Sequence, residues 1–220
     1  MKLGSLVITI GIALISIGGI LTVNYLNIKE KTTPKEVIYE YVPVENEIIF
    51  GDINSPNKII EFGSYTCPHC AEFYTSVVPS IKSGLVETGE AVFIYRHLPI
   101  DSISNAATNI TSCDKDNQEK ILDIFYRNQN KLIEIGSLAS DEEVNVGNEI
   151  YTLLVDNGIS VTEEHKTCAF SSFTQEKNAT IMQEQIQTFQ LEATPTIIVN
   201  GLKMVGIIPA EEIIQKIRNK

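Results

Sequence analysis

The chain has 220 residues, of which 43% are hydrophobic, so it can bury a full core and is not disordered as a whole. Its 17 Lys and Arg residues face 28 Asp and Glu residues, which gives a net charge of −11 at pH 7. No basic cluster interrupts this negative charge, and such a surface repels a phosphate backbone, which excludes nucleic acid as a partner.

The first predicted element is a membrane anchor. From Leu3 to Val23 the chain carries no charge, and about 20 apolar residues span the hydrocarbon core of a bilayer. A cleaved signal peptide has a shorter apolar region of about 7–15 residues, followed by small residues at the cleavage site. We therefore predict a signal anchor over residues 1–23, with late cleavage as the alternative. Residues 24–36 are polar, include a proline and are predicted to be a linker.

Globular sequence begins at residue 37 and alternates between two apolar patterns. Short apolar runs bounded by turn residues predict strands at 58–62, 91–95, 196–200 and 203–207. Helical spacing of apolar residues fills most of the chain between the second and third runs and returns at its end. Asn200-Gly201, between the last two runs, is a strong hairpin signal. The predicted fold class is therefore α/β, a mixed sheet interrupted by a helical insertion at about 102–190 within a domain over 37–220.

A pair of cysteines is the most specific motif of the sequence. Cys67 and Cys70 enclose Pro68 and His69 in the stretch CPHC. Haem attachment needs a histidine directly after the second cysteine, but Ala71 stands there. Structural zinc needs a second ligand pair at close spacing, and the remaining cysteines and histidines are too scattered to provide one. The motif is therefore predicted to be a redox centre, with no metal or other cofactor.

The surroundings of the motif supply what a reactive thiol needs. A strand ends just before it, and the apolar spacing downstream predicts a helix that starts at or just after Pro68, whose missing N–H is not needed there. Cys67 then lies at the helix N-terminus, where free N–H groups and the helix dipole stabilise a thiolate. Cys70, one turn further, is expected to be more buried and to keep its proton. Protonated His69 would stabilise the Cys67 thiolate further and make the disulfide more oxidising.

The stretch CPHC after a strand, together with ATPTIIVNG far downstream, resembles the DsbA-like branch of the thioredoxin superfamily. The resemblance runs from about residue 37 to the C-terminus, and the helical block between the two motifs matches the helical insertion of that branch. It implies a protein disulfide oxidoreductase that forms disulfide bonds in reduced, unfolded client proteins of the periplasm or cell envelope. It also implies a membrane partner, DsbB-like or otherwise quinone-linked, that reoxidises the cysteine pair.

The same resemblance assigns further site residues. Pro195 would be the cis-proline that faces the cysteines, leaving the backbone of Thr194 free to pair with a substrate strand. Glu61 falls where the family has a buried acid, whose raised pKa suits it to exchange a proton with Cys70; a solvated strand glutamate is the alternative. Thr194 differs from the aliphatic residue of the best-known oxidase and also occurs in isomerases, so an isomerase or reductase is the second hypothesis. A membrane-anchored metallochaperone that uses the CPHC side chains as ligands is the third.

The other cysteines, Cys113 and Cys168, both fall in the predicted helical insertion. Two thiols in an oxidising compartment usually pair, so we expect a structural disulfide, with two buried free thiols as the alternative. Of the remaining histidines, His97 is expected to be structural and His165 to be solvated.

Overall fold

The computed structural model describes residues 38–138 and 145–219. The predicted anchor (1–23) and linker (24–36) lie outside the described residues. Within the two described ranges, every helix is too short or too polar to cross a bilayer.

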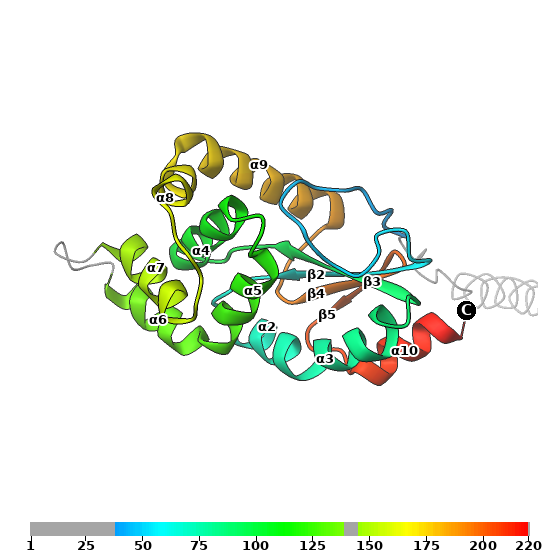
Figure 1. Cartoon of the computed structure of the whole chain (residues 1–220). Coiled ribbons are helices and arrows are strands. Elements are labelled where there is room, and N and C mark those ends of the chain that lie inside the picture. Colours follow the sequence, from blue (N-terminus) through cyan, green and yellow to red (C-terminus); the bar gives the residue numbers. More distant parts are fainter. Residues whose placement is uncertain (1–37, 139–144, 220) are drawn as a thin grey trace, which may run out of the picture. The chain divides into compact units, whose positions relative to one another are not determined.

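A five-stranded mixed sheet forms the centre of the described structure (Figure 1). Its strands are β1 (Ile48–Phe50), β2 (Asn57–Gly63), β3 (Ala91–His97), β4 (Thr196–Val199) and β5 (Leu202–Val205). They lie in the order β1-β3-β2-β4-β5, with β2 and β3 parallel and the other neighbours antiparallel. Strand β1 has only 3 residues and is not predicted from the sequence.

Helices surround the sheet. Between β2 and β3 lie α2 (Pro68–Glu72), η1 (Phe73–Val77), α3 (Val78–Ile81) and η2 (Lys82–Val86), a run in which α-helical and π-helical turns alternate. Between β3 and β4 lie α4 (Ser102–Cys113), α5 (Gln118–Arg127), α6 (Gln129–Ser137), α7 (Val146–Asp156), α8 (Glu163–Phe170) and α9 (Ser172–Phe189). The last helix is α10 (Ala210–Arg218). The predicted helical insertion into an α/β sheet is therefore confirmed.

Both faces of the sheet are buried, because side chains alternate along each strand. Ile59 and Tyr95 point to the face that carries the residues of α2, α3 and α10. Ile60 and Ile94 point to the opposite face, where Phe189 of α9 packs. Figure 1 shows α3 and α10 on one side of the sheet and α9 on the other. Burial on both faces explains why the central strands read as nearly continuous apolar runs.

The predicted hairpin joins β4 to β5. Asn200 and Gly201 form its two-residue turn, with φ values of 48° and 88° that suit asparagine and glycine. The side chain of Asn200 accepts a hydrogen bond from the backbone N–H of Lys58 at 3.0 Å, which ties the hairpin to β2.

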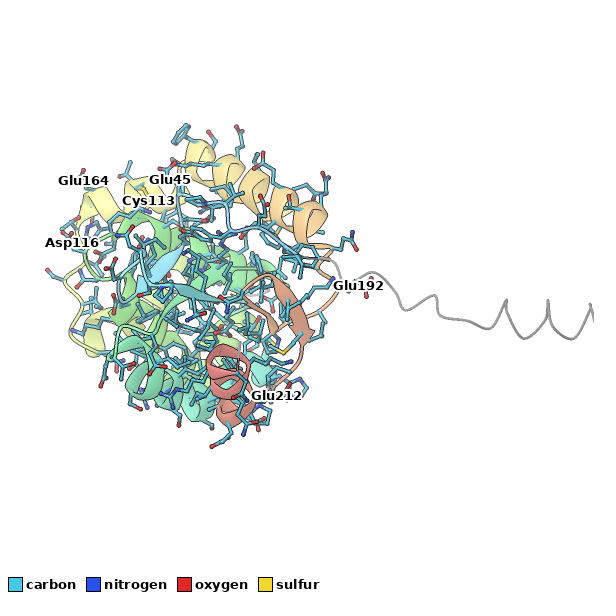
Figure 2. The ribbon with its side chains drawn as sticks, turned by 90° about the vertical axis from the view of Figure 1, so that its right-hand side faces the viewer. Glu45, Cys113, Asp116, Glu164, Glu192 and Glu212 are labelled. Carbon is cyan, nitrogen blue, oxygen red and sulfur yellow. A yellow bond between two sulfur atoms is a disulfide. The ribbon has the colours of Figure 1, made fainter. Side chains whose placement is uncertain are left out.

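A disulfide joins the end of α4 to α8. It links Cys113 and Cys168, whose Cα atoms are 5.9 Å apart. Both cysteines line a hollow together with Glu45, and Figure 2 shows Cys113 next to that residue. The other acidic side chains labelled in Figure 2, Asp116, Glu164, Glu192 and Glu212, are exposed, in keeping with the negative net charge.

Candidate active site

Cys67 is the N-cap residue of α2, and Pro68 occupies the first turn, as the sequence predicts. The Cys67 carbonyl accepts hydrogen bonds from the N–H groups of Cys70 and Ala71, at 3.1 and 3.2 Å. Both cysteines of the pair are free thiols in the structure. The side chain of Cys70 is fully buried, whereas Cys67 keeps 5% of its surface exposed. The helix start therefore presents one sulfur at the surface and hides the other beneath it.

Hydrogen-bond donors around Cys67 favour its thiolate. The Cys70 thiol donates to the Cys67 sulfur and contributes most to a lowering of the Cys67 pKa to about 5, assisted by the Thr194 side chain and by the backbone N–H groups of Cys70 and His69. Burial opposes this shift. When protonated, the thiol of Cys67 instead donates to the carbonyl of Thr194 at 3.3 Å. That acceptor favours the thiol form, but the donors outnumber it.

Glu61 lies on β2 and is fully buried, so it is not a solvated strand residue. Burial raises its pKa well above the usual range, and the negative charge of Cys67 raises it further. Burial likewise raises the pKa of Cys70, with smaller increases from its hydrogen bond to Cys67 and from the charge of Glu61. Glu61 and Cys70 are thus two buried groups whose surroundings favour the protonated form, whereas the surroundings of Cys67 favour the thiolate.

The loop before β4 closes the site from the other side. The peptide bond between Thr194 and Pro195 is cis, and it places the Thr194 carbonyl against Cys67. Pro195 is buried and Thr194 is half-buried, so the edge of the site next to Cys67 is formed by backbone as well as by side chains. The structure therefore brings together Cys67, Cys70, Thr194 and Pro195 from segments far apart in the sequence.

The helical insertion also reaches the site. Gln129, the first residue of α6, donates its side-chain amide to the carbonyls of Tyr65 and Cys67, both at 2.9 Å. The Thr66 hydroxyl donates to Asp101, which caps the N-terminus of α4. The loop that leads to the cysteines is thus held from two helices of the insertion.

The other candidate residues lie apart from the sulfurs or at their edge. The side chain of His69 is exposed, and only its backbone N–H is turned toward Cys67. His97 is buried between the rings of Tyr65 and Tyr95. In the two described ranges, no group of three or more His, Cys, Asp or Glu residues is placed to hold a metal ion.

A family model described as "Thioredoxin" matches residues 44–218, which include every site residue named above. The chain belongs to the thioredoxin family. With its helical insertion between β3 and β4, the chain has a fold similar to that of DsbA proteins of known structure. The crystal structure of alpha-DsbA1 from Wolbachia pipientis has the same fold, with a TM-score of 0.65 and 22% sequence identity over 81% of this chain and 92% of that one.

Two relatives of this chain are named for disulfide chemistry. Disulfide bond formation protein D of Bacillus subtilis is 23% identical over 80% of this chain and 78% of its own length. A protein of Rickettsia bellii named as a protein-disulfide oxidoreductase is 28% identical over 56% of this chain. The match spans only 45% of the length of the Rickettsia protein.

Three residues around Glu61 and the cysteine loop were not predicted from the sequence: Gly63 and Tyr126, which lie close to the Glu61 carboxyl group, and Gln129. Gly63 is the last residue of β2, two positions after Glu61. Glycine in a strand often marks a place where other groups approach the backbone closely, so this residue could have been noticed in the sequence. Gln129 and Tyr126 lie far along the chain in the insertion, and no local pattern indicates that they approach the cysteines.

Proposed function

We propose that the chain is an extracytoplasmic thiol:disulfide oxidoreductase that introduces disulfide bonds into secreted or envelope proteins by exchange at Cys67 and Cys70. The observation that carries this proposal is the opposite shift of the two pKa values, lowered to about 5 at Cys67 and raised at Cys70. A stabilised thiolate stabilises the reduced form, so the disulfide is a stronger oxidant.

The reaction begins with a thiolate of the client attacking the Cys67 sulfur of the oxidised enzyme. The Cys67–Cys70 bond breaks, and Cys70 leaves with the electron pair and takes up a proton. A second client thiolate then attacks the client sulfur of the mixed disulfide, and Cys67 leaves as a thiolate. The client dithiol loses two electrons and two protons; the enzyme gains both electrons and one proton, and the other proton goes to solvent.

The loop at Thr194 and Pro195 is proposed to bind the client. Its backbone forms the wall of the site next to Cys67, which suits strand pairing with an extended client segment. His69 is proposed to act through its exposed imidazole, which when protonated would stabilise the Cys67 thiolate. Glu61 is proposed to supply the proton that Cys70 takes up, because it is the buried acid coupled to that thiol.

The location of the enzyme and its oxidant belong to the same proposal. The uncharged N-terminal segment supports anchoring in the cytoplasmic membrane with the catalytic domain outside. A reduced enzyme needs an electron acceptor before its next turnover, and a DsbB-like or other quinone-linked membrane protein would serve. The name of the Bacillus subtilis relative, disulfide bond formation protein D, supports the direction of the reaction.

The test is to trap the mixed disulfide. Replacing Cys70 by Ala should leave client adducts on Cys67, since the sulfur that releases them is absent, and replacing Cys67 by Ala should abolish the adducts. Non-reducing electrophoresis of cell envelopes detects them. Adducts that persist without Cys67 would show that another cysteine reacts.

An isomerase or reductase is the second candidate, and the contact between Thr194 and Cys67 favours it, because threonine at this position also fits an isomerase. Equilibration of the Cys67–Cys70 couple with glutathione separates the two. An oxidase should stay reduced even when oxidised glutathione predominates. A couple as reducing as thioredoxin, about −270 mV, would favour the second candidate.

A further inference from the structure

Glu61 lacks a polar partner in the structure. Both carboxyl oxygens are buried, and neither has a hydrogen-bond partner among the described residues. No salt bridge in the described part of the chain includes Glu61. The titratable groups that couple to it are Cys67 and Cys70 of the redox pair and the phenols Tyr74, Tyr95 and Tyr126. Each of these groups is neutral or negative, so none of them can act as a counter-ion when Glu61 gives up its proton.

Gly63 opens a space next to this carboxyl group. A Cβ atom at Gly63 would lie 2.8 Å from the Tyr126 hydroxyl and 3.1 Å from Oε1 of Glu61. Both oxygens therefore approach the same point, the position that a side chain at residue 63 would occupy. The same Cβ atom would lie 2.7 Å from the Tyr95 ring. Glycine at position 63 is thus what lets the tyrosines come close to the acid.

The two tyrosine hydroxyls form a short chain. Tyr95 and Tyr126 share a hydrogen bond of 2.9 Å, buried within the core. The Tyr126 hydroxyl then donates to the carbonyl of Ser64 at 3.4 Å, which is long for an O–H···O bond. A weakly held hydroxyl loses little when it rotates to a charged acceptor, and bonds to charged groups are about twice as strong as neutral ones.

The position of Tyr95 is fixed by the sheet. Tyr95 pairs with Glu61 in the register of the parallel strands β2 and β3, so both side chains point to the same face. Tyr126 reaches that face from α5 and stacks on Tyr74 at a ring-centroid distance of 4.9 Å. The phenol pair is therefore built from the sheet and from the insertion together, and it is held by packing on both sides.

From this geometry we infer that Tyr126, polarised by Tyr95, is the hydrogen-bond donor that stabilises the Glu61 carboxylate after it has given its proton to Cys70. The inference rests on the proposed function. Tyr126 acts through Glu61 and is a positioning residue: its hydroxyl turns from the Ser64 carbonyl to Oε1 of Glu61, and no covalent bond changes at the tyrosine. Gly63 keeps the space between them open.

The test replaces Tyr126 by Phe and measures the titration of Glu61 from its carboxyl band in the infrared difference spectrum against Glu61→Gln. Loss of the donor should raise the pKa of Glu61, with about a tenfold change in its proton dissociation constant. Tyr95→Phe should shift it in the same direction by less. Tyr65→Phe is the matched control, because it removes a buried hydroxyl of the same aromatic cluster that is bonded to Thr111.

Equal shifts in Tyr126→Phe and Tyr65→Phe would overturn the inference, since both variants would then act only through packing. Thermal unfolding of each variant checks that it is folded. If Tyr126→Phe does not fold, Tyr95→Phe decides the matter: no shift beyond that of the control overturns the inference. The titration of Glu61 needs no client, so the two proposals can fail separately. A shift of the Glu61 pKa in a protein that forms no client adducts would refute the proposed function alone. Client adducts without a shift of the Glu61 pKa would refute this inference alone.

Discussion

The side chain of Gln129 is hydrogen-bonded to the backbone carbonyl of Cys67 at 2.9 Å, although the two residues belong to the helical insertion and the thioredoxin core, respectively. The same amide also binds the Tyr65 carbonyl, so one buried side chain holds the loop on both sides of Thr66. Without this amide the buried Tyr65 carbonyl would lose its donor, at a cost of about 1–3 kcal/mol, whereas the Cys67 carbonyl keeps the N–H groups of Cys70 and Ala71. The insertion therefore fixes the backbone of Cys67, which carries the reactive sulfur.

Replacing Gln129 by Leu should lower the free energy of unfolding by about 1–3 kcal/mol and raise the pKa of Cys67. The pKa should rise because the loop no longer holds the sulfur in line with the N–H groups of α2. Urea unfolding and the pH dependence of thiolate absorbance measure the two effects. Gln175→Leu is the control, because it removes an exposed amide that binds the Phe170 carbonyl. A Cys67 pKa that is unchanged in Gln129→Leu would contradict the positioning role.

A second prediction concerns Thr194. Its side chain lowers the pKa of Cys67, so Thr194→Val should raise that pKa by up to about one unit and make the disulfide less oxidising. Thr196→Val is the control, because the Thr196 hydroxyl donates to the Ala193 carbonyl at 2.7 Å rather than to the sulfur. Thiolate absorbance and glutathione equilibration provide the readouts. Equal shifts in the two variants would mean that the Thr194 hydroxyl has no specific effect.

Local signals were enough to predict much of this site and fold. Cys67 at the start of a helix, the hairpin at Asn200-Gly201 and the helical insertion each depend on residues close together in the sequence. The short strand β1 was not predicted, because three residues are too few to show an alternating apolar pattern. Its place in the sheet comes from its pairing with β3. Tyr126 and Gln129 were not predicted, because they act through contacts with residues more than 60 positions away along the chain. Contacts of that kind are set by packing, which apolar periodicity does not encode.

The third prediction concerns the bond between Cys113 and Cys168, which closes a loop with a sequence separation of 55. Replacing both cysteines by Ser should lower the free energy of unfolding by about 4 kcal/mol, since the unfolded chain regains the entropy of the open loop. The effect of reductant is compared in two proteins that both carry Ser at 67 and 70. Reductant should destabilise the one that keeps Cys113 and Cys168 by a similar amount and leave the one without them unaffected. Mass mapping of unreduced peptides tests the bond directly. Alkylation of both cysteines without reductant would contradict the prediction.

The last prediction concerns pH and His97. This ring is 2% exposed, and neither ring nitrogen has a hydrogen-bond partner among the described residues. Burial, and to a lesser degree the charge of Lys115, lowers its pKa from 6.5 to about 3. Between these two values the unfolded chain binds a proton that the folded protein does not, so stability is lost as the pH falls below 6.5. At pH 5 the loss from this residue should be about 2 kcal/mol relative to pH 7, since one pH unit is worth about 1.36 kcal/mol.

Urea unfolding at pH 7 and pH 5 measures this loss. His97→Leu should show a smaller drop between the two conditions than the parent protein, because it removes the group that the unfolded chain protonates. Ile121→Val is the control, because it perturbs the buried core without removing a titratable group, and it should keep the drop of the parent. Other groups whose pKa changes on folding, Glu61 among them, are present in all three proteins, so their contributions cancel in the comparison. An equal drop in the parent and in His97→Leu would mean that His97 is protonated in the folded protein, in which case its ring must have found a partner or water.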